Sequence, residues 1–155
     1  IIVESEPAVV TKCRGDGMPV YFGDAKNPVF LKCCGIMQAR GVIITVNKPS
    51  VADDIVTSVR ELRPDIVIVA RAGDEGHARH LYKLGVTDAV PETVEASLQL
   101  SEATLVGLGV PTGPVIASIH EKRDEFREVL SGAAGRPTRG LRASQVKSTN
   151  KEADA

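Results

Sequence analysis

Two acidic residues stand directly after two short apolar runs near the start of the chain. Glu4 follows "IIV", and Asp24 lies in the triplet Gly23-Asp24-Ala25 after "VYF". A carboxylate is an acceptor-only group that takes hydrogen bonds from two hydroxyls at once, so Glu4 is suited to hold a ribose at the end of a strand. Asp24 is suited to accept from the exocyclic amine of adenine, while Gly23 lets a flat ring approach the backbone.

Each acid also has a purely structural interpretation. Glu4 can cap or simply precede a helix that begins near Pro7, and either Asp24 or Asn27 can cap a helix that begins at Pro28. For each residue alone both interpretations stay open. The nucleotide interpretation is favoured because the two acids fall at the ends of consecutive strands, where one adenosine could touch both.

Two more polar residues follow predicted strands further along the chain. Asn47 follows the apolar run 42–46, and Arg71 follows the run 66–70. In an open parallel sheet, ligands bind outside the carboxyl ends of the strands. We therefore expect Asn47 to border the ligand and Arg71 to meet a phosphate or a carboxylate across an interface.

These residues depend on an alternation of short strands and helices for their placement. The predicted strands are 1–4, 20–23, 41–46, 65–70 and 88–90, and the predicted helices are 7–14, 28–34, 51–62, 74–84 and 93–108. "VIITV" and "IVIVA" are unbroken apolar runs, as expected for strands covered on both faces. Right-handed crossovers then predict an α/β fold, a Rossmann-like doubly wound parallel sheet.

The chain changes character after Gly109. A linker and a charged amphipathic helix are predicted for residues 110–130, with the helix from 115 to 130. Residues 131–155 hold five Lys or Arg against two Asp or Glu and almost no large apolar residue, so a disordered basic tail is predicted. The sequence thus divides into a nucleotide-binding domain at 1–109, the linker and helix, and the tail.

Composition narrows the function classes. The net charge of -1 provides no basic field for nucleic acid. The sequence shows no bilayer-spanning apolar run and no signal peptide, so we expect a soluble chain, which could be the soluble part of a membrane protein. The three cysteines predict reduced thiols, with Cys33 and Cys34 in the core of a short helix. His77 and His80 predict a solvated helix face rather than a metal site.

A glycine-rich phosphate loop is the component that the sequence lacks. A G-x-G-x-x-G motif is expected about twenty residues before the ribose acid, and none occurs in the 155 residues. The chain begins at the strand that carries Glu4. We therefore expect a domain that is truncated at its N-terminus and lacks the first strand and its glycine-rich loop. Phosphate binding is expected only when that strand and loop are present.

The ordered motifs resemble one family. "VYFGDAKNPVFLKCCGI", "RGVIITVN", "IVIVARAGDEGHARHLYKLGVTDAVPETVEASLQLSEATLVGLGVP" and "ASIHEKRDEFREVL" are similar to the RCK domain of Kef-type monovalent cation:proton antiporters. This domain, the regulator of potassium conductance, is also called the TrkA N-terminal domain. The resemblance covers about residues 1–130.

This resemblance implies a regulatory domain rather than an enzyme. Such domains lie on the cytoplasmic side of the inner membrane, are attached to the transmembrane antiporter, form dimers and gate potassium efflux. They bind NAD(H), AMP or ATP. Matched by motif, Glu4 would hold the ribose, the triplet at 23–25 the adenine edge, and Asn47 and Arg71 would flank the pocket. The helix at 93–108 would pack against a second RCK subunit.

Two other functions remain open at this point. An S-adenosylmethionine-dependent methyltransferase also uses an acid after its second strand for ribose and an Asp after its third for adenine. The residues "NKP" after the run 42–46, and the scarcity of aromatic residues, disfavour that catalytic site. A structural oligomerisation domain without a ligand is the other alternative, and the missing glycine loop favours it.

Overall fold

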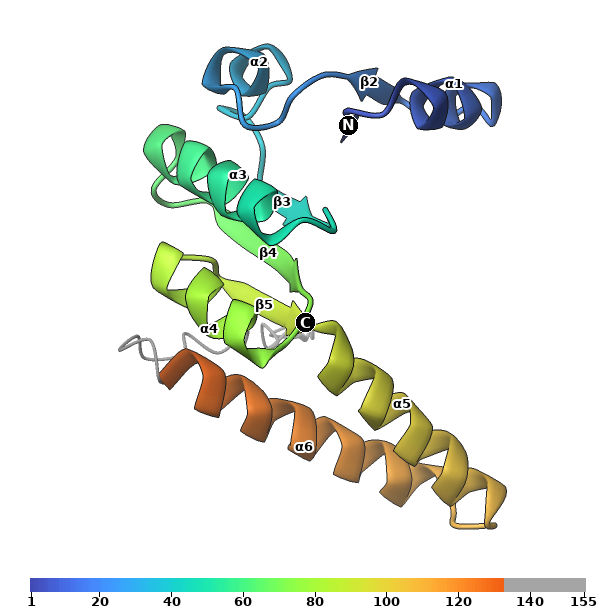
Figure 1. Ribbon diagram of the computed structural model, residues 1–155. Helices are drawn as coiled ribbons and strands as arrows, with labels where there is room; N and C mark the ends of the chain where they lie inside the picture. The colour runs from blue at the N-terminus through green and yellow to red at the C-terminus, as the bar shows by residue number, and fades with distance from the viewer. Residues whose placement is uncertain (133–155) are drawn as a thin grey trace, which may run out of the picture.

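The computed structural model describes residues 1–132, in which parallel strands alternate with helices (Figure 1). The strands are β1 (Ile2–Glu4), β2 (Val20–Phe22), β3 (Gly41–Ile44), β4 (Val67–Ala72) and β5 (Asp88–Pro91). The helices are α1 (Pro7–Gly15), α2 (Pro28–Cys33), α3 (Pro49–Leu62), α4 (Glu75–Leu84), α5 (Glu92–Gly107) and α6 (Thr112–Gly132). The order of elements and the α/β class are confirmed.

Every strand pair is parallel, but the described strands form two sheets. β1 pairs with β2, and β3, β4 and β5 form the second sheet in that order. No described strand pairs with both β1 and β3, so the two sheets are separated where the first strand of the predicted truncated sheet would lie. In the Rossmann order 3-2-1-4-5-6, these two sheets correspond to strands 3-2 and 4-5-6.

The main core lies between the three-stranded sheet and the helices α3 and α4 (Figure 1). Side chains alternate along the strands, so that Ile44 and Ile68 are buried against these helices. Ile43 points to the other face and is 78% exposed, and Val67 is also exposed. The expectation that both strands are covered on both faces is thus wrong for the described residues, since α3 and α4 pack on one face.

Helix α6 joins this core to a second, smaller one. Its first half packs against α5 through the cluster Val94, Leu98, Val115 and Ile119. Leu130, near its last turn, belongs to the main core. The two helices run side by side as an antiparallel hairpin away from the sheet (Figure 1). Because α6 packs in both cores, it attaches the hairpin to the rest of the domain.

Both predicted ends of the C-terminal helix change in this region. Helix α6 begins at Thr112, so most of the predicted linker "VPTGP" is helical. Ser131 and Gly132 also belong to α6, although they were placed in the tail. The rest of the predicted tail, 133–155, lies outside the described residues. Across residues 1–132, none of the helices combines the length and apolar character needed to cross a membrane.

The packing of α6 predicts a sharp contrast between two adjacent residues. Leu130 is 1% exposed and Val129 is 62% exposed. Leu130→Ala is expected to lower the free energy of unfolding by about 2–4 kcal/mol, because it leaves a cavity in the main core. Val129→Ala is the matched control, with an effect of about 0.5 kcal/mol or less. Urea unfolding measures both, and equal effects would contradict the placement of α6.

Candidate functional site

The turns that follow β1 and β2 lie side by side at one edge of their sheet. Glu4, the last residue of β1, is in register with Phe22, the last residue of β2. The backbone N–H of Gly23 donates to the backbone carbonyl of Glu4 at 3.0 Å. The structure therefore brings Glu4 and the triplet Gly23-Asp24-Ala25 together, as one adenosine requires.

The Glu4 carboxylate makes local hydrogen bonds through one of its oxygens. Its Oε1 accepts from the backbone N–H groups of Ser5 at 2.7 Å and Glu6 at 2.9 Å. Both contacts order the turn before α1. Within residues 1–132 the hydrogen bonds of this carboxylate all go to Oε1, so Oε2 keeps its acceptor capacity. The N-cap of α1 is Glu6, so Glu4 is not the helix cap, and its turn-ordering contacts are compatible with a ribose role.

Asp24 orders its own turn, while the cap of α2 is a different residue. Its Oδ1 accepts from the backbone N–H of Lys26 at 2.9 Å, and its side chain is exposed. Asn27 Oδ1 accepts from Val29 N at 2.8 Å and Phe30 N at 3.3 Å. Of the two predicted capping candidates, Asn27 is therefore the helix cap, and Asp24 faces solvent at the strand end.

Gly23 has a packing role that the sequence did not reveal. A Cβ atom at this position would lie 2.2 Å from Cζ of the Phe30 ring. The aromatic ring thus occupies the space over the turn that a side chain would need. Ala25, two residues later, packs against the main core. The triplet therefore links the candidate site to the body of the domain.

Asn47 and Arg71 lie at the corresponding edge of the second sheet, but neither stands where predicted. β3 ends at Ile44, so Asn47 is an exposed loop residue rather than the next residue after the strand. β4 continues to Ala72, so Arg71 lies within the strand. Its Nη1 is 2.9 Å from Oε1 of Glu92, the first residue of α5. The ion pair shows that Arg71 already holds a carboxylate.

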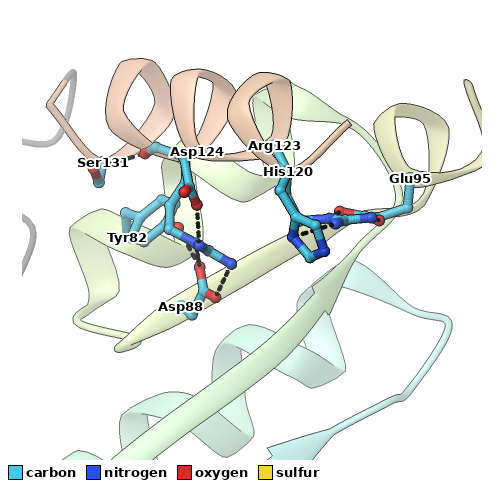
Figure 2. Close-up of polar contacts among 8 residues, drawn as sticks. Tyr82, Asp88, Glu95, His120, Arg123, Asp124 and Ser131 are labelled. Atoms are coloured by element: carbon cyan, nitrogen blue, oxygen red, sulfur yellow. Dashed lines mark hydrogen bonds and ion pairs between the residues drawn. The ribbon is translucent and has the colours of Figure 1, made fainter. Parts of the chain in front are cut away.

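A buried polar network joins α6 to the sheet (Figure 2). Asp88 is 7% exposed, and its Oδ1 accepts from the Tyr82 hydroxyl at 2.7 Å and from Arg127 Nε at 3.1 Å. Arg127 Nη2 lies 3.1 Å from Oδ2. Burial, and then the hydrogen bond to Asp88, raise the pKa of Tyr82 to about 12. No spacing in the sequence indicated this network, because its members come from three separate elements.

A second arginine on α6 holds α5. Arg123 Nε donates to Glu95 Oε1 at 2.9 Å, and its Nη2 donates to Oε2 at 2.8 Å. This bidentate geometry is the strong form of the arginine–carboxylate contact. His120 Nδ1 lies 3.5 Å from Arg123 Nη1 (Figure 2). One turn of α6 therefore separates the contact with α5 from the contact with β5.

The prediction of a solvated helix face is wrong for His77 but fits His80, whose side chain is 52% exposed. His77 Nε2 lies 3.3 Å from Asp53 Oδ1, and His80 Nε2 lies 3.1 Å from Asp53 Oδ2. The His77 side chain is only 10% exposed, because α3 packs against α4 there. The described residues contain no group of three or more His, Cys, Asp or Glu side chains arranged to hold a metal ion.

The cysteines also differ from the prediction of a buried pair. All three thiols are free, and Cys33 is exposed while Cys34 is partly buried. The short helix α2 buries Leu31 instead and turns Cys33 outward. Burial, with a smaller contribution from the neighbouring Cys33, raises the pKa of the Cys34 thiol.

Comparison with known proteins identifies the domain. Residues 1–92, more than half of the chain, match the TrkA-N domain family. This chain belongs to the TrkA-N family. The match covers the elements from β1 to the first residue of α5, so it includes every strand end considered above.

The relatives of this TrkA-N chain include proteins named as potassium efflux antiporters. It is 31% identical over 128 residues, 83% of the chain, to "Putative K(+) efflux antiporter KefB" of Alkalimonas amylolytica. It is 31% identical over 146 residues, 93% of the chain, to "K(+) efflux antiporter 3, chloroplastic" of Arabidopsis thaliana. The chain spans 19% of the length of each relative.

Solved structures show the same fold. The Kef C-terminal domain of Shewanella denitrificans in an AMP-bound form has a TM-score of 0.66 at 24% identity, covering 86% of this chain and 96% of that one. The TrkA-N domain of the inner membrane protein ybaL of Escherichia coli has a TM-score of 0.60 at 26% identity, covering 65% and 75%. The GsuK channel bound to NAD has a TM-score of 0.59 at 20% identity, covering 64% and 18%.

The close approach of Phe30 predicts a cost for any side chain at residue 23. Gly23→Ala is expected to lower the free energy of unfolding by about 1 kcal/mol, because the ring must move aside. Gly15→Ala is the control, since a Cβ at that position meets no atom within 4 Å. Thermal unfolding compares the two variants. A Gly23→Ala protein as stable as the parent would show that Phe30 does not restrict this turn.

The buried hydroxyl of Tyr82 predicts a loss of stability in alkali. The ordinary tyrosine pKa is about 10, and the pKa of Tyr82 is raised to about 12 in the folded protein. The protonated form therefore contributes stability below pH 10, and about 2–3 kcal/mol of it is lost as the pH rises toward 12.

Tyr82→Phe removes this titration and tests the prediction. The variant is less stable than the parent at neutral pH because a hydrogen bond to Asp88 is lost. The difference between the two proteins in denaturant unfolding should shrink between pH 10 and 12. A constant difference over that range would exclude Tyr82 as the titrating group.

Proposed function

We propose that this TrkA-N chain is the regulatory nucleotide-binding domain of a potassium efflux antiporter and performs no catalysis itself. The observation that carries this proposal is the juxtaposition of the two strand-end turns, each of which contains a carboxylate residue. The antiporter relatives support the physiological setting. In this setting the domain lies on the cytoplasmic face of the membrane and is attached to the transmembrane antiporter.

The ligand that suits these turns is NAD(H) or another adenine nucleotide such as AMP or ATP. Glu4 Oε2 accepts from a ribose hydroxyl, while Oε1 keeps its bonds to the turn. Asp24 accepts from the adenine amine, and the backbone of Gly23 and Ala25 borders the edge of the adenine ring, since Phe30 fills the space over Gly23. Asn47 and Arg71 flank the pocket from the second sheet. AMP and NAD in two solved structures of this fold support the ligand class.

The phosphates need a further component. β1 and β3 each have an edge that pairs with no described strand, and in the Rossmann order one parallel strand lies between them. A glycine-rich loop after such a strand would present backbone N–H groups to the pyrophosphate. We propose that this strand and loop belong to the full-length protein, and that nucleotide binding is conditional on them.

The α5–α6 hairpin is the proposed contact with a second copy of the domain. Leu100 and Leu108 are 70% and 76% exposed, and Val106 and Ile116 are also exposed. Large apolar side chains exposed on one hairpin favour burial against another surface. The same observation supports the alternative of a structural oligomerisation domain without ligand, which nucleotide titration distinguishes.

The proposed adenine contact is tested by Asp24→Ala in the full-length protein. Loss of a charge-assisted hydrogen bond is expected to weaken binding of AMP and NADH about tenfold in calorimetry. Thermal stability should stay nearly the same, because Asp24 is exposed.

Asp16→Ala is the matched control. Asp16 is another exposed acid, but it lies between α1 and β2, at the opposite edge of the sheet. The Asp16→Ala substitution should leave the affinities for AMP and NADH unchanged. Equal affinity in the parent and in Asp24→Ala would refute the adenine role, and tight binding of S-adenosylmethionine instead would indicate the methyltransferase alternative.

A further inference from the structure

The ion pair between Arg71 and Glu92 connects the ligand edge of the sheet to the hairpin. Arg71 is the penultimate residue of β4, and Glu92 is the first residue of α5, directly after β5. Their side chains approach to 2.9 Å and are 31% and 53% exposed. The contact is therefore formed within the domain, yet it is accessible to a ligand.

Replacing Glu92 by a phosphate as the partner of Arg71 costs little free energy. A half-exposed ion pair contributes little net stability, because water solvates both partners when they separate. A guanidinium binds a phosphate with the same bidentate geometry that it uses for a carboxylate. Glu92 also lies at the N-terminus of α5, where the helix dipole stabilises its charge without Arg71. After the ion pair separates, Arg71 can therefore bind a phosphate, and Glu92 remains stabilised by the dipole of α5.

The remainder of α5 is tied to other elements. Glu95, one turn after Glu92, is held by Arg123 of α6 through the bidentate contact. Arg127, one turn after Arg123, is held by Asp88 of β5. The ion pair of Glu92 is the one contact in this series that faces the candidate ligand edge. Its exchange would free the first turn of α5 from β4 and leave the rest of the hairpin attached.

We propose that Glu92 is an internal competitor for the nucleotide: it occupies Arg71 in the ligand-free domain and is displaced by a phosphate group of the ligand. This inference rests on the proposed function and adds its regulation. The Arg71 guanidinium can then pair either with a phosphate of the nucleotide or with Glu92, but not with both. Nucleotide binding therefore releases the first turn of α5 from β4. A nucleoside without phosphate would bind without breaking the ion pair.

Calorimetry with AMP and adenosine on the full-length protein tests the competition. Glu92→Gln is expected to tighten AMP binding about two- to fivefold, because this factor corresponds to the stabilisation that a partly exposed ion pair contributes. Adenosine binding should stay unchanged. In an Arg71→Ala background, Glu92→Gln should have no effect on AMP. Glu75→Gln is the matched control, because Glu75 is the first residue of α4 and pairs with Arg79 at 3.0 Å.

The outcomes separate this inference from the proposed function. Equal changes of AMP and adenosine affinity in Glu92→Gln, no change of either, or a change that persists in the Arg71→Ala background would overturn the competition and leave the nucleotide site in place. A parent protein that binds neither ligand would overturn the proposed function and the competition with it.

Discussion

Parallel pairing of the strands is the constraint on which the candidate site depends. Because β1 and β2 run in the same direction, their carboxyl ends meet at one edge, and a single backbone hydrogen bond from Gly23 to Glu4 joins the two turns. The same rule places Arg71 at the corresponding edge of the second sheet. If either strand were reversed, the proposed ribose acid Glu4 and the proposed adenine contact Asp24 would lie at opposite ends of the sheet and could not share one ligand.

The sequence predicts the parts of this fold that local patterns determine. Apolar runs bounded by proline and glycine placed all five strands, and Asn27 before Pro28 was a recognisable helix start. The polar network around Asp88 was not predictable, because its partner Arg127 lies 39 residues away and no spacing rule joins them. The environment of His77 depends on Asp53 of another helix for the same reason.

Helix α6 fastens α5 to the three-stranded sheet and its core. Its two arginines, one turn apart, fasten α5 through Glu95 and β5 through Asp88. Leu130 adds apolar packing against the main core. The hairpin that exposes apolar side chains is therefore attached to the sheet whose edge carries Arg71. In the proposed function, this attachment is the physical path from a bound nucleotide to a neighbouring copy of the domain.

Hydrogen–deuterium exchange of the full-length protein with and without AMP is the most direct measurement of the central claim. A nucleotide held at the strand ends is expected to slow exchange of the backbone amides at 4–6 and 23–25, which form the two adjoining turns. Exchange of the backbone amides at 16–18, in the α1–β2 connection, should not change. Protection that is absent from both turns, while AMP binds elsewhere on the protein, would contradict the account.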